Sequence, residues 1–360
     1  MKPTAALRNA GQSLWLDNIT RDLLDGGVLA RYIDELSVTG LTSNPTIFDQ
    51  AIKQSPTYDA AIRAGAESGR DGESLFFDIA LDDLGRAADL FRAVHERTAG
   101  VDGWVSLEVS PPLAYDTAAT IAAARELHAR AARPNLFIKI PGTREGLPAI
   151  EEATFHGVPV NVTLLFSREH YLAAADAWLR GVERRIEAGL DPDVASVASL
   201  FISRWDVAAA KSVPPDLVNT LGVAIGRRSW VAYREFLASA RWQRAANFGA
   251  RPQRLLFAST GTKDPAAPDT LYVGALAAPL TVNTMPESTL KAWADHGVLD
   301  GTIPADGGDC EAVIAAHSAA GVDVDALGAR LQTDGAAAFV KSWHELMDVL
   351  AAKRRAVVGR

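Results

Sequence analysis

The stretch that decides the fold is a short apolar run with a single lysine, Asn135-Leu136-Phe137-Ile138-Lys139-Ile140-Pro141. Its length and composition predict a buried strand with the lysine near its carboxyl end. Because side chains alternate faces along a strand, Phe137 and Lys139 share one face. If both faces are covered, this ammonium is desolvated, and desolvation frees a lysine amine as a nucleophile toward carbonyl carbons. The alternative is an edge-strand lysine that reaches water.

The composition describes a chain long enough for one large domain or two ordinary ones. It has 360 residues, 48% of them hydrophobic, and a net charge of −8 from 36 basic and 44 acidic residues. This excess of acid argues against a general binder of nucleic acid or of anionic membranes. Cys310 is the only cysteine, so no disulfide within the chain and no zinc cluster are expected.

The N-terminus has no apolar leader, and no uncharged apolar run approaches the roughly 18 residues of a membrane span, so we expect a soluble cytoplasmic protein.

Short apolar segments alternate with longer helical patterns along the chain. Eight segments have the length and composition of strands: 14–17, 36–41, 104–109, 136–140, 158–164, 194–202, 254–259 and 280–283. Alternating strands and helices predict a parallel sheet with right-handed crossovers. Eight such units predict an α/β fold of the (β/α)8 TIM-barrel type as a single domain over residues 1–360, although about 250 residues is typical. Residues in excess of that size are expected in insertions, and two segments are typical of exposed loops, 63–73 and 304–309.

The C-terminal region carries one more amphipathic helix. Apolar residues recur at helical spacing from Phe339 through Trp343 to Leu350. We expect a helical extension over about 309–355 that packs on the barrel, with a helix that binds a partner protein as the alternative. The outer helices of a barrel can also bury apolar faces against a second copy, so the sequence leaves a homo-oligomer open.

Polar residues stand near the carboxyl end of every predicted strand. These ends converge on one mouth of a barrel, where polar groups usually serve chemistry. Each residue alone has a structural explanation, such as Asp17 as a helix N-cap or Asn44 in a turn before Pro45. Gathered at the same end of eight strands, they predict one functional site.

The chemistry that fits these residues is an amine nucleophile among carboxylates. An imine between Lys139 and a ketose withdraws electrons, so that the C3–C4 bond of the sugar can break. Asp17 is our candidate base for the C4 hydroxyl proton, and Glu108 with Thr163 are candidates for handling the water that imine formation and hydrolysis require. The seven histidines show no metal-ligand spacing, so neither a metal ion nor a cofactor is expected.

The remaining candidates are expected to bind a small sugar phosphate. Amide, hydroxyl and aromatic groups that could fix the sugar are Thr42, Asn44, Ser106, Asn161, Ser199 and Phe201. A phosphate at the far end of the substrate would be held by Arg204, Ser259 and Lys263.

Several of these segments resemble the signature segments of the transaldolase family, and they occur in the family's order. They are GLTSNPT at 40–46, VSLEV at 105–109, FIKIP at 137–141, VNVTLLFS at 160–167, ASLFISR at 198–204, ASTGTK at 258–263 and TVNTMP at 281–286. The resemblance extends from Trp15 to Trp343. The last two segments are most similar to the longer bacterial branch, which is related to fusions of transaldolase with glucose-6-phosphate isomerase.

The resemblance implies a (β/α)8 enzyme of the non-oxidative pentose phosphate pathway. Such an enzyme moves a dihydroxyacetone unit from sedoheptulose 7-phosphate to glyceraldehyde 3-phosphate, giving erythrose 4-phosphate and fructose 6-phosphate. It further implies that Lys139 forms the Schiff base and that Asp17 is the acid–base carboxylate. Glu108 and Thr163 match the pair that handles the catalytic water.

The phosphate site departs from the family pattern at one position. Arg204 and Ser259 match phosphate contacts, but many transaldolases carry an arginine where this chain has Gly261. Lys263 could replace that cation, although a lysine is a point charge where arginine offers a planar fork.

Two other functions are left open by the sequence. A lysine-imine aldolase could release free dihydroxyacetone or act on an unusual sugar phosphate. A barrel that binds sugar phosphates without catalysis belongs to a different class, and the presence of Lys139, Asp17 and Glu108 speaks against it.

Overall fold

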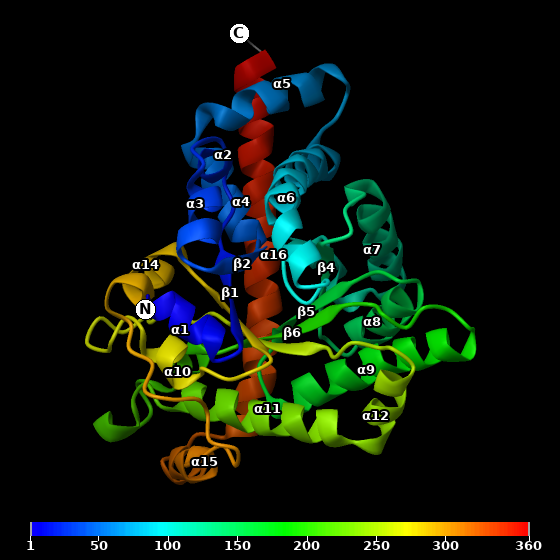
Figure 1. The fold of residues 1–360 in the computed structure, drawn as a ribbon. Coiled ribbons are helices and arrows are strands. Elements are labelled where there is room, and N and C mark those ends of the chain that lie inside the picture. The colour runs from blue at the N-terminus through cyan, green and yellow to red at the C-terminus, as the bar shows by residue number, and fades with distance from the viewer. Residues whose placement is uncertain (1, 359–360) are drawn as a thin grey trace.

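Eight parallel strands close into one barrel in the computed structural model, which describes residues 2–358 (Figure 1). Neighbouring strands pair in chain order, and β8 pairs with β1. The strands are β1 (Gln12–Asp17), β2 (Val38–Thr42), β3 (Trp104–Glu108), β4 (Leu136–Pro141), β5 (Val160–Leu165), β6 (Ser196–Phe201), β7 (Arg254–Ala258) and β8 (Thr281–Met285). Each overlaps one predicted segment, so the predicted (β/α)8 barrel is confirmed.

Helices surround the barrel and fill the insertions between its strands. The α-helices are α1 (Pro3–Asn9), α2 (Arg21–Asp25), α3 (Val28–Glu35), α4 (Pro45–Gln54), α5 (Asp59–Glu67), α6 (Gly72–Arg97), α7 (Thr117–Ala131), α8 (Gly146–Phe155), α9 (Arg168–Glu187), α10 (Ser203–Ala209), α11 (Leu221–Ala238), α12 (Ala240–Asn247), α13 (Leu271–Ala275), α14 (Glu287–His296), α15 (Cys310–Ala319) and α16 (Val324–Val358). Short 3-10 helices are η1 (Pro56–Tyr58), η2 (Pro111–Tyr115) and η3 (Pro215–Leu217).

The prediction of a loop over 63–73 is wrong for its first half, which is helical. Helix α5 continues to Glu67, so the connection to α6 is confined to 68–71. A Cβ on Gly65 would lie 2.4 Å from Leu75 of α6. This glycine therefore serves close helix packing, and the sequence pattern alone did not distinguish that role from a turn.

Aromatic rings fill the barrel beneath its carboxyl-terminal mouth. Trp104 and Phe137 stack with their centroids 4.1 Å apart, and Trp15 lies 6.1 Å from Phe137. We call these three residues the aromatic floor. Gly40 of β2 permits it, because a Cβ there would lie 2.6 Å from the Trp15 indole. All three side chains are buried, so the floor is part of the packed barrel core rather than a pore.

The longest helix, α16, spans the length of the molecule and is drawn in red in Figure 1. It packs on α4, α5 and α6. Trp343 meets the Phe76 ring edge-on at 5.0 Å, and Lys353 Nζ donates to the Ser55 carbonyl oxygen at 2.7 Å. These contacts fix the direction of α16, and so decide which of its residues meet the barrel.

Among residues 2–358, no single helix combines the length and the hydrophobicity needed to cross a membrane. Among these residues, only α15 and α16 taken together are long enough and hydrophobic enough, and the chain bends by 92° at the break between them.

Candidate active site

Lys139 lies inside the barrel, with strands on both sides of it. Strand β4 pairs with β3 and with β5, so the edge-strand alternative is wrong. The residue is 5% exposed. Its Nζ donates to the Ser43 carbonyl oxygen at 3.1 Å and lies 3.5 Å from Glu108 Oε2. The amine is therefore enclosed, with one carboxylate close enough to exchange a proton with it directly or through one water.

Asp17 faces the same space from β1. Its Oδ1 accepts a hydrogen bond from Thr42 Oγ1 at 2.7 Å, and the Thr42 hydroxyl also bonds the Thr284 hydroxyl at 2.7 Å. Burial raises the pKa of Asp17 above its ordinary value, while the charge of Lys139, the Thr42 hydrogen bond and the charge of Lys263 act in the opposite direction. An ionised carboxylate in such a place is a better base than one in water.

Glu108 and Thr163 bring unpaired polar atoms next to Lys139. Both carboxylate oxygens of Glu108 and the Thr163 hydroxyl are buried without a hydrogen-bond partner among the described residues. Burial raises the pKa of Glu108, and the nearby charge of Lys139 opposes the shift. An unpartnered buried polar group costs about 1–3 kcal/mol, so three of them in one place indicate a water or substrate binding position.

A buried polar triplet links the strands next to Lys139. Asn161 Nδ2 donates to Ser106 Oγ at 3.1 Å, and Ser199 Oγ donates to Asn161 Oδ1 at 2.7 Å. Of the three, only Ser199 lines the cavity described next, while Ser106 and Asn161 are completely buried. Their geometry suits them to fixing the orientation of Ser199.

The carboxyl-terminal mouth holds a cavity of about 120 Å³. The predicted candidates that line it are Asp17, Thr42, Asn44, Lys139, Thr163, Ser199, Phe201, Arg204, Ser259 and Lys263. Asn44 also caps α4, since its Oδ1 accepts from the Ile47 backbone N–H at 3.1 Å, which leaves its amide nitrogen for a ligand. The structure thus brings together residues from strands far apart in the sequence.

One end of the cavity is cationic. The Arg204 guanidinium lies 5.0 Å from the Phe201 ring centroid and 5.8 Å from that of Phe339. Burial lowers the pKa of Arg204, which nevertheless stays charged because a free guanidinium titrates far above neutral pH. Ser259 holds a left-handed backbone angle of +57°, and its hydroxyl bonds that of Ser203 at 2.9 Å. The exposed Lys263 also lines the cavity, and its charge acts on Asp17.

Sequence reasoning missed the contribution of α16 to the cavity. Phe339 lines it, and Gln332 Nε2 donates to the carbonyl oxygens of Gly142 and Leu164 at 3.0 Å each. A Cβ on Gly335 would lie 3.1 Å from an Arg204 nitrogen, so this glycine lets the helix approach. Phe339 belonged to an apolar stripe, but no local signal distinguished it from the other residues of that stripe.

Thr284, at the end of β8, and Pro286 also line the cavity and were not among the candidates for substrate binding. The polar end of β8 pointed to Thr284, whereas nothing in the sequence pointed to Pro286. A Cβ on Gly261 would lie 3.0 Å from Pro286 Cγ and 3.4 Å from Thr289 Oγ1. A larger side chain at position 261 would therefore have to displace Pro286.

Among the described residues, no group of three or more histidine, cysteine, aspartate or glutamate side chains is arranged to hold a metal ion.

Comparison with known proteins gives one consistent family. Residues 14–350 match the family model described as Transaldolase/Fructose-6-phosphate aldolase. The chain is 48% identical over 352 residues to a protein named Transaldolase from Acidothermus cellulolyticus, with 96% of this chain and 95% of that one covered. It is 46% identical over 358 residues to a Transaldolase from Thermobifida fusca, with 97% of each chain covered. A Transaldolase from Frankia alni is 45% identical over 360 residues, with 97% and 96% covered.

Proposed function

Because the chain belongs to the transaldolase/fructose-6-phosphate aldolase family, we propose that it is a transaldolase whose Lys139 forms the Schiff base with the substrate. It transfers a dihydroxyacetone unit from sedoheptulose 7-phosphate to glyceraldehyde 3-phosphate, which gives erythrose 4-phosphate and fructose 6-phosphate. The observation that carries the proposal is the enclosed Lys139 amine with Glu108 3.5 Å away and Asp17 in the same cavity.

Imine formation is the first step. The neutral amine of Lys139 attacks the ketose carbonyl carbon, and the oxygen leaves as water after it has been protonated. Glu108 is the nearest carboxylate to the amine, and both of its oxygens are free of other hydrogen bonds. We assign it, with the Thr163 hydroxyl, to shuttling protons through that water.

Bond cleavage follows. Asp17 takes the proton of the C4 hydroxyl, the C4 oxygen becomes the aldehyde, and the C3–C4 electron pair moves into the imine to give an enamine on Lys139. The aldose phosphate then leaves. In the second half, the enamine carbon attacks the acceptor aldehyde, Asp17 returns its proton to the new hydroxyl, and water hydrolyses the imine. Lys139 and Lys263 favour the ionised form of Asp17 that the first half requires.

The phosphate is assigned to the cationic end of the cavity. Arg204 presents its guanidinium there and, in the described part of the chain, forms no ion pair that would neutralise it. Ser259 and Lys263 add a hydroxyl donor and a second charge. Pro286 occupies the space beside Gly261, so we assign to Lys263 the charge that arginine supplies in many transaldolases.

The partners of this reaction are small sugar phosphates, and the steps above use no metal ion or cofactor. We place the protein in the cytoplasm, where such intermediates are metabolised. A homo-oligomer remains a prediction.

Borohydride reduction with fructose 6-phosphate tests the proposal. The expected result is a protein that carries one reduced dihydroxyacetone unit, measured by intact mass and located on Lys139 by peptide mapping. Lys263→Met, which removes the other lysine of the cavity, should still be modified, and Lys139→Met should not. An unmodified wild-type protein, or an adduct on another lysine, would refute the mechanism.

The same family name also covers aldolases, which release the three-carbon unit to water. The relatives named Transaldolase favour transfer. Incubating the enzyme with fructose 6-phosphate should give little free dihydroxyacetone without an acceptor, and sedoheptulose 7-phosphate once erythrose 4-phosphate is added. Steady release of dihydroxyacetone without an acceptor would make the chain an aldolase.

A further inference from the structure

The amino-terminal pole of the barrel, opposite the catalytic mouth, contains two adjoining hollows. The first, of about 390 Å³, is lined by His95, Glu96, Asp193 and others, and we call it the His95 hollow. The second, of about 430 Å³, lies over the start of β7, and we call it the Arg254 hollow. Gly100, Trp104, Ala195 and Arg251 line both. The catalytic mechanism uses neither.

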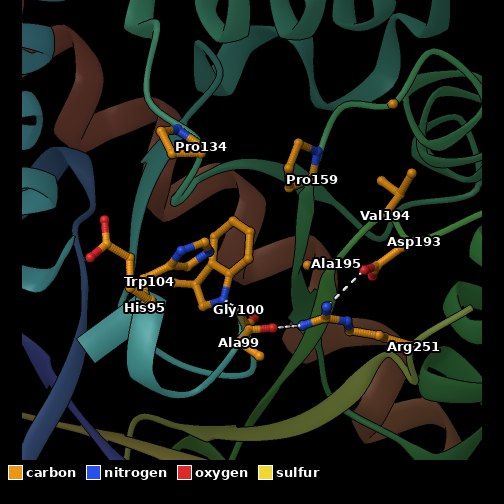
Figure 2. A pocket seen from close by; sticks show the side chains of 12 residues that line it. His95, Ala99, Gly100, Trp104, Pro134, Pro159, Asp193, Val194, Ala195 and Arg251 are labelled. Atoms are coloured by element: carbon orange, nitrogen blue, oxygen red, sulfur yellow. Dashed lines mark hydrogen bonds and ion pairs between the residues drawn. The ribbon is translucent and has the colours of Figure 1, made fainter. Parts of the chain in front are cut away.

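Arg251 lines both hollows, and Figure 2 shows it in the wall of the His95 hollow, where its guanidinium reaches Asp193. Its guanidinium forms an ion pair with Asp193 at 2.8 Å and donates a hydrogen bond to the Ala99 carbonyl oxygen. Asp193 thus neutralises Arg251. The His95 hollow contains a second carboxylate, Glu96, so its lining is poorly suited to an anion.

The Arg254 hollow has the opposite balance of charge. Its lining contains three arginines, Arg8, Arg251 and Arg254, and a single carboxylate, Asp102. Because Asp193 pairs with Arg251, the excess of positive charge comes from Arg8 and Arg254. Both oxygens of Asp102 already accept hydrogen bonds, one from the Ser13 hydroxyl and one from Trp15 Nε1. Each Asp102 oxygen therefore already has a donor, and the carboxylate lies 4.0 Å from Arg254 Nη1.

Arg254 is a buried cation with an unused donor. It is 8% exposed. Its terminal nitrogens donate to the carbonyl oxygens of Val101 at 3.0 Å and Thr281 at 2.8 Å, and to Ser13 Oγ at 2.5 Å. Its Nε is buried and has no partner among the described residues. The Arg254 guanidinium lines the hollow, so an anion bound there would pair with its charge.

Apart from Gln12, Ser13 and Ser196, the rest of the lining is apolar and includes two flat rings. Trp104 and Phe137, two rings of the aromatic floor, face the Arg254 hollow together with Val197. A ligand pocket typically has this make-up, with apolar walls and a few polar groups that fix orientation, in a volume of about 300–1,000 Å³.

We propose that the Arg254 hollow is a second binding site, which accepts a small organic anion with a flat apolar body. The body lies against Trp104 and Phe137, and the anionic group points to Arg254. The site lies at the other end of the barrel from Lys139, so it is occupied independently of the catalytic cavity. It does not depend on the proposed reaction.

Calorimetric titration with naphthalene-2-carboxylate tests this proposal, with naphthalene-2-carboxamide as the uncharged isostere. The carboxylate is expected to bind at least about tenfold more tightly than the amide, since it alone pairs with a cation. Arg254→Gln should lower the affinity for the carboxylate by at least about tenfold, and the affinity for the amide should stay within about twofold of the wild-type value.

Three further variants locate the site. Ala195→Phe fills the hollow without changing any arginine and should abolish binding of both compounds, whereas Ala195→Ser should leave both unchanged. Arg204→Gln, which removes the arginine of the catalytic cavity, should also leave carboxylate binding unchanged. Because Ala195 lies on the wall, its variants give an answer even if Arg254→Gln fails to fold.

Four results would overturn the proposal. They are no binding of the carboxylate, equal binding of carboxylate and amide, binding that survives Ala195→Phe, and binding lost in Arg204→Gln but kept in Arg254→Gln. The last result would assign the anion to the catalytic cavity.

Discussion

At the scale of single residues, burial is what differentiates the carboxyl groups near Lys139 from surface carboxylates. Asp17 and Glu108 both have raised pKa values, and in both desolvation is the largest cause. The charge of Lys139 opposes each shift, so the three groups form a coupled set. Their hydrogen bonds differ, since Thr42 donates to Asp17 while Glu108 accepts none. This difference suits Asp17 to a fixed role as base and Glu108 to exchange with water.

Asp17→Asn should separate imine formation from bond cleavage. The isosteric amide keeps the cavity filled but cannot accept the C4 hydroxyl proton. We expect borohydride still to trap an adduct on Lys139, now carrying the whole uncleaved sugar phosphate, while kcat falls about 10²- to 10⁴-fold. Parallel trapping and steady-state assays check this. Turnover within a few-fold of the wild type would show that another group is the base.

The pH profile should reflect the raised pKa of Asp17. The base must be ionised, so kcat/KM should fall as the pH decreases through a value above the 3.8 of an ordinary aspartic acid. The Thr42 hydrogen bond favours the ionised form, and its loss in Thr42→Val should move this acidic limb to higher pH.

Thr163→Val is the control for that shift, because Thr163 makes no hydrogen bond to Asp17. It should lower kcat without moving the acidic limb. A limb that stays in place in Thr42→Val would mean that the profile reports a group other than Asp17.

At the scale of secondary-structure elements, α16 adds side chains to a cavity that the strand ends and their loops otherwise form. Gln332 and Phe339 lie two turns apart on the helix and both reach the strand ends. Gln332 donates to two backbone carbonyl groups at the strand ends, and the Phe339 ring lies 5.8 Å from the Arg204 guanidinium. The helix therefore forms part of the cavity wall near Arg204.

Phe339→Leu should weaken phosphate recognition with little loss of stability. Leucine keeps an apolar side chain on α16 but removes the aromatic face over Arg204, a contact of about 0.5–2 kcal/mol. We expect KM for glyceraldehyde 3-phosphate to rise roughly 2- to 30-fold. For unphosphorylated glyceraldehyde, KM should stay unchanged.

Trp343→Leu is the matched control, one turn further along α16. Trp343 packs on Phe76 and Phe77 rather than on Arg204, so its loss should cost stability and leave both KM values alone. If the two variants changed KM equally, the effect would come from loosening of the helix and not from Phe339.

At the scale of the whole molecule, a buried network at the amino-terminal pole holds the ends of the barrel together. Arg254 of β7 bonds Ser13 of β1 and the backbone of Thr281 in β8, while Asp102 before β3 bonds Ser13 and Trp15. The network therefore crosses the point where the last strand meets the first.

Arg254→Met should lower the free energy of unfolding by about 1–3 kcal/mol, because it removes the buried guanidinium that donates to the carbonyl oxygens of Val101 and Thr281. Urea unfolding measures the loss. Arg8→Met, an exposed position at the same pole, should stay within about 0.5 kcal/mol of the wild type. Both variants should keep the wild-type kcat, since Lys139 lies at the other end of the barrel.

The strands and most of the cavity could be predicted because their signal is local. Asp17, Lys139 and Thr163 follow from strand length, alternation and the rule that parallel strand ends meet. Phe339 could not be predicted in this way, because its place depends on the direction of α16, which distant packing of Trp343 on Phe76 decides. The same holds for Arg254 and Asp102, whose partners are set by closure of the whole barrel.

The position of α16 at the C-terminal end of the described chain also has a consequence for folding during synthesis on the ribosome. Ribosomes build chains from the amino terminus, so all eight strands and Lys139 are complete before residues 324–358 emerge. An unfinished chain already contains its reactive amine, but it lacks the wall that Phe339 and Gln332 provide. The proposed phosphate-binding end of the cavity is therefore completed only after residues 324–358 have been synthesised and have packed on the barrel.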